Sequence, residues 1–201
     1  SGKLENYIQR EFYSPLGMAT MGYKPLEKFP LSGIVPTEND TAFRKQLIHG
    51  YVHDPGAAML GGVGGHAGVF GTANDLAKLM QMYLQKGEYA GKRYIKPATI
   101  SEFTSTQYGA EGNRRALGFD KPETDTTKSS PACRDASPSS FGHTGFTGTM
   151  IWVDPDEQLV YVFLSNRVHP SAGNNLLVEM NVRTEIQQVI YDAIRKANRG
   201  K

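Results

Sequence analysis

The residues best equipped to do chemistry in this chain stand together in one short segment. Residues 141–149 read F-G-H-T-G-F-T-G-T and run directly into the apolar stretch 150–153. The imidazole of His143 can donate a hydrogen bond, and it is positively charged only when it is protonated. Gly145 has no side chain and leaves room for a ligand. The residues alone leave two interpretations open, and one is a ligand-facing strand end. The alternative is a histidine that only bonds a neighbouring carbonyl at a strand start.

Three further histidines precede this segment and raise the question of a metal. His49 and His53 stand four residues apart, the spacing of a helical metal site, but a glycine lies between them and a proline follows Asp54. The H-E-x-x-H pattern of zinc hydrolases is absent. We therefore expect no metal and no cofactor. A metal hydrolase that uses His49, His53 and His66 is kept as an alternative, which bound zinc would reveal.

Residues 61–71 are rich in glycine, with glycines at positions 61, 62, 64, 65 and 68. They do not fit a phosphate-binding loop, because that motif requires a lysine after its last glycine. The segment is better explained as a loop that needs positive φ angles and close packing. His66 lies inside it and is a candidate for the wall of a cleft.

The bulk composition excludes several classes of partner. The chain has 201 residues, 39% hydrophobic and 21% charged, which is ordinary for a globular protein. A formal net charge of +2 is too small to argue for nucleic acid or for an anionic membrane surface. No apolar stretch approaches the length of a membrane span. The single cysteine, Cys133, excludes an internal disulfide.

The first half of the chain is predicted to mix helices with irregular segments. Residues 3–12 have the apolar period of a helix, whereas residues 19–60 carry four prolines and no sustained period. A stronger helix follows the glycine-rich loop, where Thr72 can cap it and Asp75 completes an approximate capping box. A shorter helix is expected after Pro97. The expected core stripes are Leu4, Tyr7, Ile8 and Phe12 in the first helix, and Leu76, Leu79, Met80, Tyr83 and Leu84 in the second.

The second half is predicted to contain an antiparallel hairpin and a C-terminal helix. Residues 108–140 are polar, with a short strand at 117–119. Two strands are expected at 143–153 and 158–165, joined by a type I turn with proline at its second position. Both are apolar nearly throughout, which suits a sheet that is covered on both faces. The last helix is expected to pack on the hairpin through Ile186, Val189, Ile190, Ala193 and Ile194.

These elements predict one mixed α/β (α+β) domain over residues 1–201, with an antiparallel sheet packed by helices. Residues 1–107 would form a mostly helical lobe with the glycine-rich loop. Residues 108–140 would form a polar loop, and residues 141–201 the hairpin and the C-terminal helix.

Residues 141–149 resemble the third motif of serine enzymes that use an S-x-x-K nucleophile, where it usually reads K-T-G. Three more segments match in order. Residues 12–18 resemble an F-x-P-L-G-M segment, residues 65–76 a glycine-rich stretch that opens a helix, and residues 164–167 an L-x-N-[KR] strand end. The chain is thus similar, through nearly its whole length, to the class C β-lactamase-like serine hydrolases and penicillin-binding proteins. It looks most like a subgroup often fused behind a glycoside hydrolase family 3 domain.

The resemblance implies roles for individual residues. A serine would attack an ester or amide carbonyl, as in a cell-wall peptide or a β-lactam, and the backbone N–H of Phe146 would bind the oxyanion. Thr144 and His143 would hold polar groups of the substrate, and Gly145 would make room for it. His53 and His66 would lie on the cleft wall. Asn166 and Arg167 would meet a substrate carboxylate, or else form a solvated strand end.

The departures from the family pattern are equally informative. The sequence contains no S-x-x-K and no Y-x-N or S-x-N. In the family both motifs precede the F-x-P-L-G-M segment, so we expect them upstream of Ser1. The chain would then be the C-terminal part of a bacterial serine hydrolase of the cell envelope, periplasm or medium, and its partner the missing upstream segment. The alternative is a non-catalytic ligand-binding or accessory domain.

The expected lack of the first strands has a structural consequence. A sheet without them exposes an edge and apolar surface. We therefore expect this chain to self-associate, or to show disorder in residues 108–140.

Overall fold

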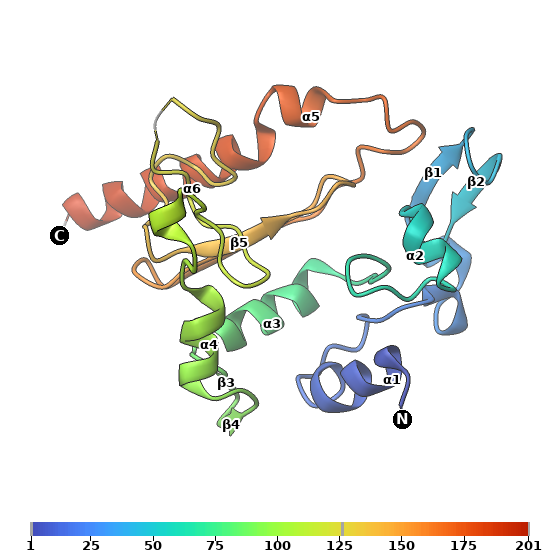
Figure 1. Ribbon diagram of the computed structural model, residues 1–201, viewed down its shortest axis with the longest axis horizontal. Helices are drawn as coiled ribbons and strands as arrows, with labels where there is room; N and C mark the ends of the chain where they lie inside the picture. Colours follow the sequence, from blue (N-terminus) through green and yellow to red (C-terminus); the bar gives the residue numbers. More distant parts are fainter. Residues whose placement is uncertain (1, 126, 201) are drawn as a thin grey trace. The chain divides into compact units, whose positions relative to one another are not determined.

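The computed structural model describes residues 2–125 and 127–200 (Figure 1). These residues pack into two compact units. Unit 1 contains the residues up to Lys78 together with Phe146–Gly148 and Leu164–Asn175. Unit 2 contains Leu79–Gly145, Thr149–Phe163 and the residues from Leu176 onward. In the described ranges no helix is both long enough and apolar enough to cross a bilayer.

The sheet of unit 2 has three antiparallel strands in the order β5-β6-β7. They are β5 (Phe141–Thr144), β6 (Met150–Asp154) and β7 (Leu159–Phe163). The prediction of one continuous strand over residues 143–153 is therefore wrong. The chain reverses at residues 145–149, and β5 pairs with β6 so that His143 lies opposite Ile151. The reversal is closed by a hydrogen bond of 2.8 Å from the N–H of Gly145 to the carbonyl of Thr149.

Side chains from both faces of this sheet are buried, as predicted. On one face Met150, Trp152 and Tyr161 form a core with Ala132, and Ile190 packs against it. On the other face Phe141 and Val153 form a core with Met80. Successive strand residues point to opposite faces, so Trp152 and Val153 serve different cores. Helix α6 (Val182–Arg199) lies along the first face, and the C-terminal part of α3 (Ala73–Leu84) along the second (Figure 1).

The predicted apolar stripe of the last helix is only partly correct. Ile190 packs on the sheet, but Ile186 is 42% exposed and Val189 is 66% exposed. The residues that α6 buries are Gln187 and Tyr191, four positions apart on one face. Each has a polar partner inside the unit: Gln187 accepts from the N–H of Cys133, and Tyr191 donates to Asp154. Polar side chains thus occupy the buried face of α6, which the apolar periodicity did not predict. Ala193 is also exposed, and Ile194 is half-buried.

Asp154 ends β6 and collects several of these hydrogen bonds. Its carboxylate accepts from the hydroxyl of Ser137 at 2.6 Å and from the N–H of the same residue at 2.9 Å. Burial by itself raises the pKa of Asp154, but the hydrogen bonds from Ser137 and Tyr191 outweigh it and leave the pKa below its ordinary value. The ionised carboxylate is therefore part of the folded structure.

The remaining elements of unit 2 are short. They are β3 (Glu88–Tyr89), β4 (Lys92–Arg93), α4 (Pro97–Thr104), η4 (Gly109–Glu111) and α5 (Leu176–Glu179). Helix α4 begins at Pro97, close to the predicted position. The strand predicted at 117–119 is wrong: Gly118 has a φ of +82°, which turns the chain, and an isolated bridge forms instead between Asp120 and Gly142.

Unit 1 begins with α1 (Leu4–Ile8) and a π-helical turn, η1 (Gln9–Tyr13), where a helix was predicted. Its expected apolar stripe is not buried at the start, since Leu4 is 40% exposed and Tyr7 is 51% exposed. Two short 3₁₀ turns follow, η2 (Pro25–Glu27) and η3 (Leu31–Gly33).

The region predicted to be irregular, residues 19–60, contains a hairpin and a helix. The elements are β1 (Pro36–Asp40), β2 (Gln46–His49) and α2 (Pro55–Met59). The strands read P-T-E-N-D and Q-L-I-H, which carry little apolar alternation. The carboxylate of Asp40 organises the turn between them, because it accepts from the N–H groups of Ala42, Phe43 and Arg44.

The start of α3 also differs from the predicted capping box. Asp75 accepts hydrogen bonds from the N–H and the hydroxyl of Thr20, both at 2.7 Å. Thr72 pairs with the same hydroxyl at 2.9 Å. The first turn of the helix is therefore held by a residue far away in the sequence.

Candidate functional site

The third-motif segment forms the hairpin between β5 and β6. A side chain at Gly142 would collide with the carbonyl of Ile151 and the ring of Trp152. A side chain at Gly145 would collide with the hydroxyl of Thr149. Gly142 is therefore required by the packing of the hairpin itself, whereas at Gly145 the Thr149 side chain would have to move. The room that Gly145 would leave for a substrate stays a prediction.

His143 is held between two partners of opposite hydrogen-bonding character. Its Nδ1 lies 2.8 Å from the carbonyl of Thr144, which can only accept. Its Nε2 lies 3.1 Å from Nη2 of Arg115, which can only donate. The two contacts fit the tautomer in which Nδ1 donates to Thr144 and Nε2 accepts from Arg115. The alternative interpretation, a histidine that bonds a neighbouring carbonyl, is thus part of the observed geometry.

Arg115 is the residue that the sequence reasoning missed. Its guanidinium is 48% exposed and supplies the permanent positive charge that His143 does not. It is held by Asp120, whose Oδ1 lies 3.0 Å from Nη1 of Arg115 and 3.1 Å from Nη1 of Arg114. The only available signal was the Arg-Arg pair in a polar loop, and no spacing rule connects that pair to a strand start 28 residues later.

A cavity of about 300 Å³ lies beside Thr144 within unit 2. Three arginines line it, Arg114, Arg115 and Arg183, against one acidic residue, Asp120. Hydroxyl groups of Ser129, Ser130 and Thr184 are also in its wall. A positively charged cavity with hydroxyl donors is suited to a carboxylate or another anion.

Phe146, the predicted oxyanion donor, belongs to unit 1 with the two residues that follow it. Arg167 donates from Nε to the carbonyl of Phe146 and from its backbone N–H to that of Thr147, both at 2.9 Å. Its guanidinium also lies 4.4 Å from the centre of the Phe146 ring. The hydroxyl of Ser165 bonds the carbonyl of Gly148 at 2.8 Å. The strand end at 165–167 therefore fixes the backbone of the motif's loop.

The donors of Asn166 and Arg167 contact protein acceptors. Asn166 donates from Nδ2 to the carbonyls of Pro36 and Thr37, at 2.6 and 2.9 Å. Nη1 of Arg167 is shared among the carbonyls of Ala172 and Asn174 and the side chain of Asn175. The contacts are those of residues that join separate segments of unit 1. Their predicted contact with a substrate carboxylate stays a prediction.

The structure brings His53 to the third-motif loop. Its ring stacks on that of Phe146, with centroids 5.1 Å apart and an angle of 11° between the planes. Nδ1 of His53 lies 2.7 Å from Oε1 of Glu38, which Arg44 also contacts at 2.8 Å. His53 is thus oriented by a nearly buried carboxylate and adjoins the residue predicted to bind the oxyanion.

His66 and His49 are engaged elsewhere. Nε2 of His66 lies 2.9 Å from Oδ1 of Asp54, the residue that caps α2. The N–H of Ala57 is the main cause that lowers the pKa of Asp54, and His66 adds to it. His49 bonds the carbonyl of Ile34 at 2.5 Å. Within the described ranges no group of three histidine, cysteine or acidic side chains could hold a metal ion. The described residues therefore provide no site at which His49, His53 and His66 could share a zinc ion.

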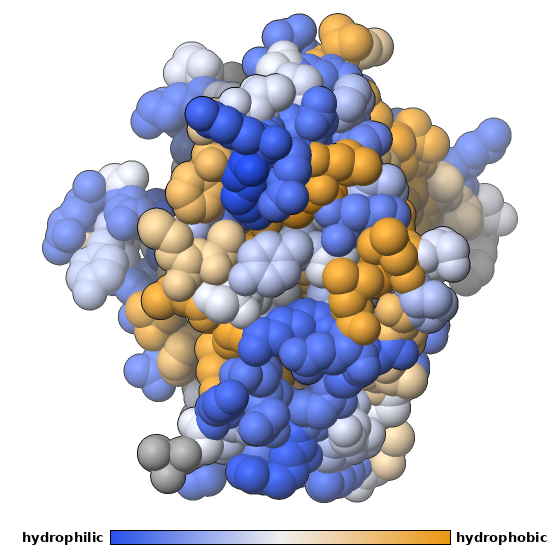
Figure 2. All heavy atoms as spheres, turned by 90° about the vertical axis from the view of Figure 1, so that its right-hand side faces the viewer, coloured by the Kyte–Doolittle hydropathy of each residue, from blue (hydrophilic) through white to orange (hydrophobic). Residues whose placement is uncertain are grey.

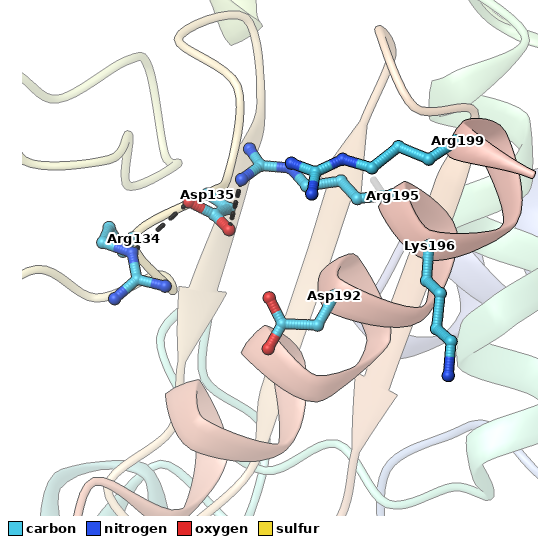
Figure 3. A pocket seen from close by; sticks show the side chains of 6 residues that line it. All are labelled: Arg134, Asp135, Asp192, Arg195, Lys196 and Arg199. Atoms are coloured by element: carbon cyan, nitrogen blue, oxygen red, sulfur yellow. Dashed lines mark hydrogen bonds and ion pairs between the residues drawn. The ribbon is translucent and has the colours of Figure 1, made fainter.

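A second charged cavity, of about 280 Å³, lies beside the last turns of α6 (Figure 3). Asp135 is paired there with Arg195 at 2.6 Å and with Arg134 at 3.4 Å. Basic side chains near a helix C-terminus are favoured by the helix dipole, which explains Lys196 and Arg199 without a ligand. None of the predicted site residues lines this cavity.

Fold and site together define a class of protein. An antiparallel sheet is covered by helices on both faces, and an H-T-G tripeptide ends the strand at the sheet's edge. That combination resembles the third-motif strand of a serine β-lactamase or penicillin-binding protein. The chain belongs to the beta-lactamase family, whose model matches residues 1–179.

Individual relatives agree with this assignment. The "Putative D-alanyl-D-alanine carboxypeptidase" of Salmonella enteritidis PT4 is 33% identical over 183 residues, which is 85% of this chain and 42% of that protein. The fold is similar to a mutant simvastatin synthase from Aspergillus terreus, with a TM-score of 0.60, 17% identity and coverage of 96% of this chain and 51% of that one. It is also similar to a beta-lactamase from Mycobacterium bovis, with a TM-score of 0.51, 20% identity and coverage of 87% and 56%.

The relatives are longer than this chain. The chain spans less than half the length of the Salmonella protein that it matches. The solved structures show the fold, and the curated relative shows the family of serine hydrolases, which agrees with the resemblance described above.

Proposed function

We propose that this chain is the substrate-binding, C-terminal part of a bacterial serine hydrolase that acts by acylation and deacylation on an ester or amide. The nucleophile would be a serine of an S-x-x-K motif upstream, because the 201 residues contain neither that motif nor Y-x-N or S-x-N. The chain covers 42% of the Salmonella relative, and the rest of that protein is long enough to contain both motifs.

The observation that carries this proposal is the pairing of Arg115 with the third motif. The cation beside His143 is an arginine that lines the cavity at Thr144. A guanidinium binds a carboxylate with two parallel donors, and a hydroxyl adds a third. The substrate would therefore carry a carboxylate near the scissile bond, as a peptide that ends in D-alanyl-D-alanine does.

The backbone of Phe146 supports the chemical step. Within residues 2–125 and 127–200, its N–H makes no hydrogen bond and is available to an oxyanion. As the serine Oγ attacks the carbonyl carbon, negative charge develops on the carbonyl oxygen, and this N–H would stabilise it. The amine or alcohol would then leave with a proton, and water would hydrolyse the acyl-enzyme. Thr144, His143 and Arg115 would hold the substrate until the leaving amine, which carries the carboxylate, departs.

The test compares two substrates in the longer polypeptide that includes the coding sequence upstream of Ser1. One substrate ends in a free carboxylate and the other in a carboxamide. The change Arg115→Met should raise KM for the carboxylate about tenfold to a hundredfold and leave the carboxamide unchanged, since a charge-assisted pair contributes about 1.5–3 kcal/mol. Arg93→Met is the matched control, because Arg93 is also in unit 2 and pairs with Glu88 on the surface. Equal losses on both substrates would contradict the proposal.

A second candidate is a non-catalytic domain that captures the same anionic ligand. It is favoured by one observation, that the cavity at Thr144 is formed within unit 2 alone. Turnover by the longer polypeptide separates the two candidates, because a capture domain would bind the carboxylate substrate without hydrolysing it.

We also propose that the whole protein works in the bacterial cell envelope, where wall peptides that end in D-alanine lie. The name of the Salmonella relative supports this location. Fractionation of the source cells would test it, and recovery of the protein in the cytoplasm would contradict it.

A further inference from the structure

The loop that carries the predicted oxyanion donor has glycine at both ends. Residues 145–148 read G-F-T-G, and Gly148 has a φ of +112°. Glycine adopts more backbone conformations than any other residue, so the two glycines alone leave the position of Phe146 undefined. A backbone N–H stabilises an oxyanion strongly only when it is held in place before the reaction. Contacts from other segments to Phe146 are therefore needed to order the donor.

The ring of Phe146 is in contact with two side chains of unit 1. The imidazole of His53 stacks on it, and the guanidinium carbon of Arg167 lies 4.4 Å from its centre. Exposed apolar side chains are common on this protein, and on the face drawn in Figure 2 they form several small patches separated by hydrophilic ones. Phe146, at 62% exposed, differs from an ordinary exposed side chain because the groups on its ring are themselves fixed.

His53 is fixed both at its ring and at its backbone. Its Nδ1 lies 2.7 Å from Oε1 of Glu38, and the two side chains are only 19% and 9% exposed. Nη2 of Arg44 donates to the same carboxylate oxygen and to the carbonyl of His53, both at 2.8 Å. Arg44 is held in turn by Asp40, at 2.7 Å from Nε. The imidazole therefore presents a rigid flat face to the ring of Phe146.

These contacts restrict the backbone nitrogen of Phe146. The carbonyl of Phe146 accepts from Nε of Arg167 at 2.9 Å, which fixes one of the bonds at its Cα. The stacked ring of His53 restricts a second bond, the one to the side chain. Covalent geometry sets the angles between the bonds at Cα, so the nitrogen is restricted as well. Without the contact to His53, only the carbonyl side of Phe146 and one edge of the charge on its ring would remain held.

We propose that His53 is a positioning residue, whose ring holds Phe146 so that its backbone N–H is in place for the oxyanion. Glu38 and Arg44 hold His53 in turn. The inference rests on the proposed function, because it extends the part that the proposal gives to Phe146. In this role His53 neither contacts the reacting atoms nor transfers a proton. Its flat ring is the working feature, and its Nε2 is not.

The test uses the longer polypeptide that includes the coding sequence upstream of Ser1, with a chromogenic cephalosporin as substrate. Stopped-flow measurements give the acylation rate constant and the dissociation constant of the substrate separately. His53→Ala should lower the acylation rate constant about 10-fold to 100-fold and leave the dissociation constant unchanged, since a misplaced donor affects the transition state. His53→Phe should restore most of the rate, because it keeps a flat ring and cannot transfer a proton.

His49→Ala is the matched control. It makes the same change at another histidine of unit 1, which bonds the carbonyl of Ile34, and it should acylate at the wild-type rate. Circular dichroism would establish that each variant folds. If His53→Ala does not fold, His53→Leu replaces it, because leucine fills space without offering a flat face.

A second measurement reports the position of the donor without catalysis. Nuclear magnetic resonance of the longer polypeptide, labelled with ¹⁵N-phenylalanine, gives the order parameter of the Phe146 amide. This order parameter should fall in His53→Ala and recover in His53→Phe. A Phe146 amide that is equally ordered in the wild type and in both variants would overturn the inference.

The kinetic outcomes are equally decisive. If His53→Phe is as slow as His53→Ala, then Nε2 acts directly and the positioning role is wrong. A His53→Ala variant that acylates at the wild-type rate, or loses only substrate binding, would also overturn it. A wild type that forms no acyl-enzyme would instead overturn the proposed function, and this inference with it.

Discussion

The two units of this molecule differ in how their separate segments are joined. Unit 2 is built on apolar side chains that fill both faces of a sheet, with Trp152 on one face and Phe141 on the other. Unit 1 also buries apolar side chains, such as Met18 and Val168, and in addition joins distant segments through polar side chains, as Asn166 does with residues 36 and 37. The third motif passes from one unit to the other, because Gly145 belongs to unit 2 and Phe146 to unit 1.

The largest expected effect comes from the core of unit 2. Phe141 is 2% exposed and makes edge-on ring contacts with Tyr83 and Phe119. Phe141→Ala should lower the free energy of unfolding by about 3–5 kcal/mol, because it leaves a cavity. Urea titration followed by fluorescence of Trp152, the single tryptophan, measures the change. Phe141→Leu should cost much less, and a loss below about 1 kcal/mol for the alanine variant would contradict this view of the core.

A smaller and pH-dependent effect is expected at Asp154 in the same unit. Its folded pKa is lowered, so its carboxylate stabilises the fold above its unfolded pKa of about 3.9, and this contribution is lost as the pH falls through the folded pKa. Asp154→Asn should cost about 2 kcal/mol at neutral pH. Urea titrations at a series of pH values should show the gap between wild type and variant closing in acid. A gap that stays constant down to the lowest pH would be inconsistent with an ionised Asp154.

The smallest effect is expected for one polar link of unit 1. Asn166→Ala removes two hydrogen bonds to backbone carbonyls and should cost about 1–2 kcal/mol. Asn6→Ala, at an exposed position of α1 in the same unit, should change stability little. Hydrogen exchange resolved by residue would report each unit separately. If Asn166→Ala destabilised the chain as much as Phe141→Ala, the contrast between the units would be lost.

The sequence predicted the elements of unit 2 better than those of unit 1. The helix now seen as α3, the final helix and the strand β7 all follow from apolar runs, and α6 packs on the sheet as expected. The hairpin β1–β2 was missed because Asp40 and backbone hydrogen bonds make its turn, and such contacts leave no periodic pattern. Val189 was assigned to the core because it is apolar, and Gln187 was not because it is polar. In the structure Val189 is exposed and Gln187 is buried.

Some features of the candidate site were predicted from the sequence, and others were not. The position of the third motif came from its resemblance to a family, and the family is confirmed. Arg115 could not be predicted, because it reaches His143 through the folded loop and not through sequence spacing. The stacking of His53 on Phe146 likewise depends on how two distant segments of unit 1 meet. Contacts of this kind are set by tertiary structure alone.

The central claim is that this chain provides the substrate-binding strand while the nucleophile lies outside its 201 residues. Intact-mass spectrometry after incubation with benzylpenicillin tests it most directly, applied to this chain and to the longer polypeptide. We predict a penicilloyl adduct on the longer polypeptide, mapped to a serine upstream of Ser1, and no adduct on the chain alone. An adduct on any serine within the 201 residues, or none on the longer polypeptide, would contradict the account.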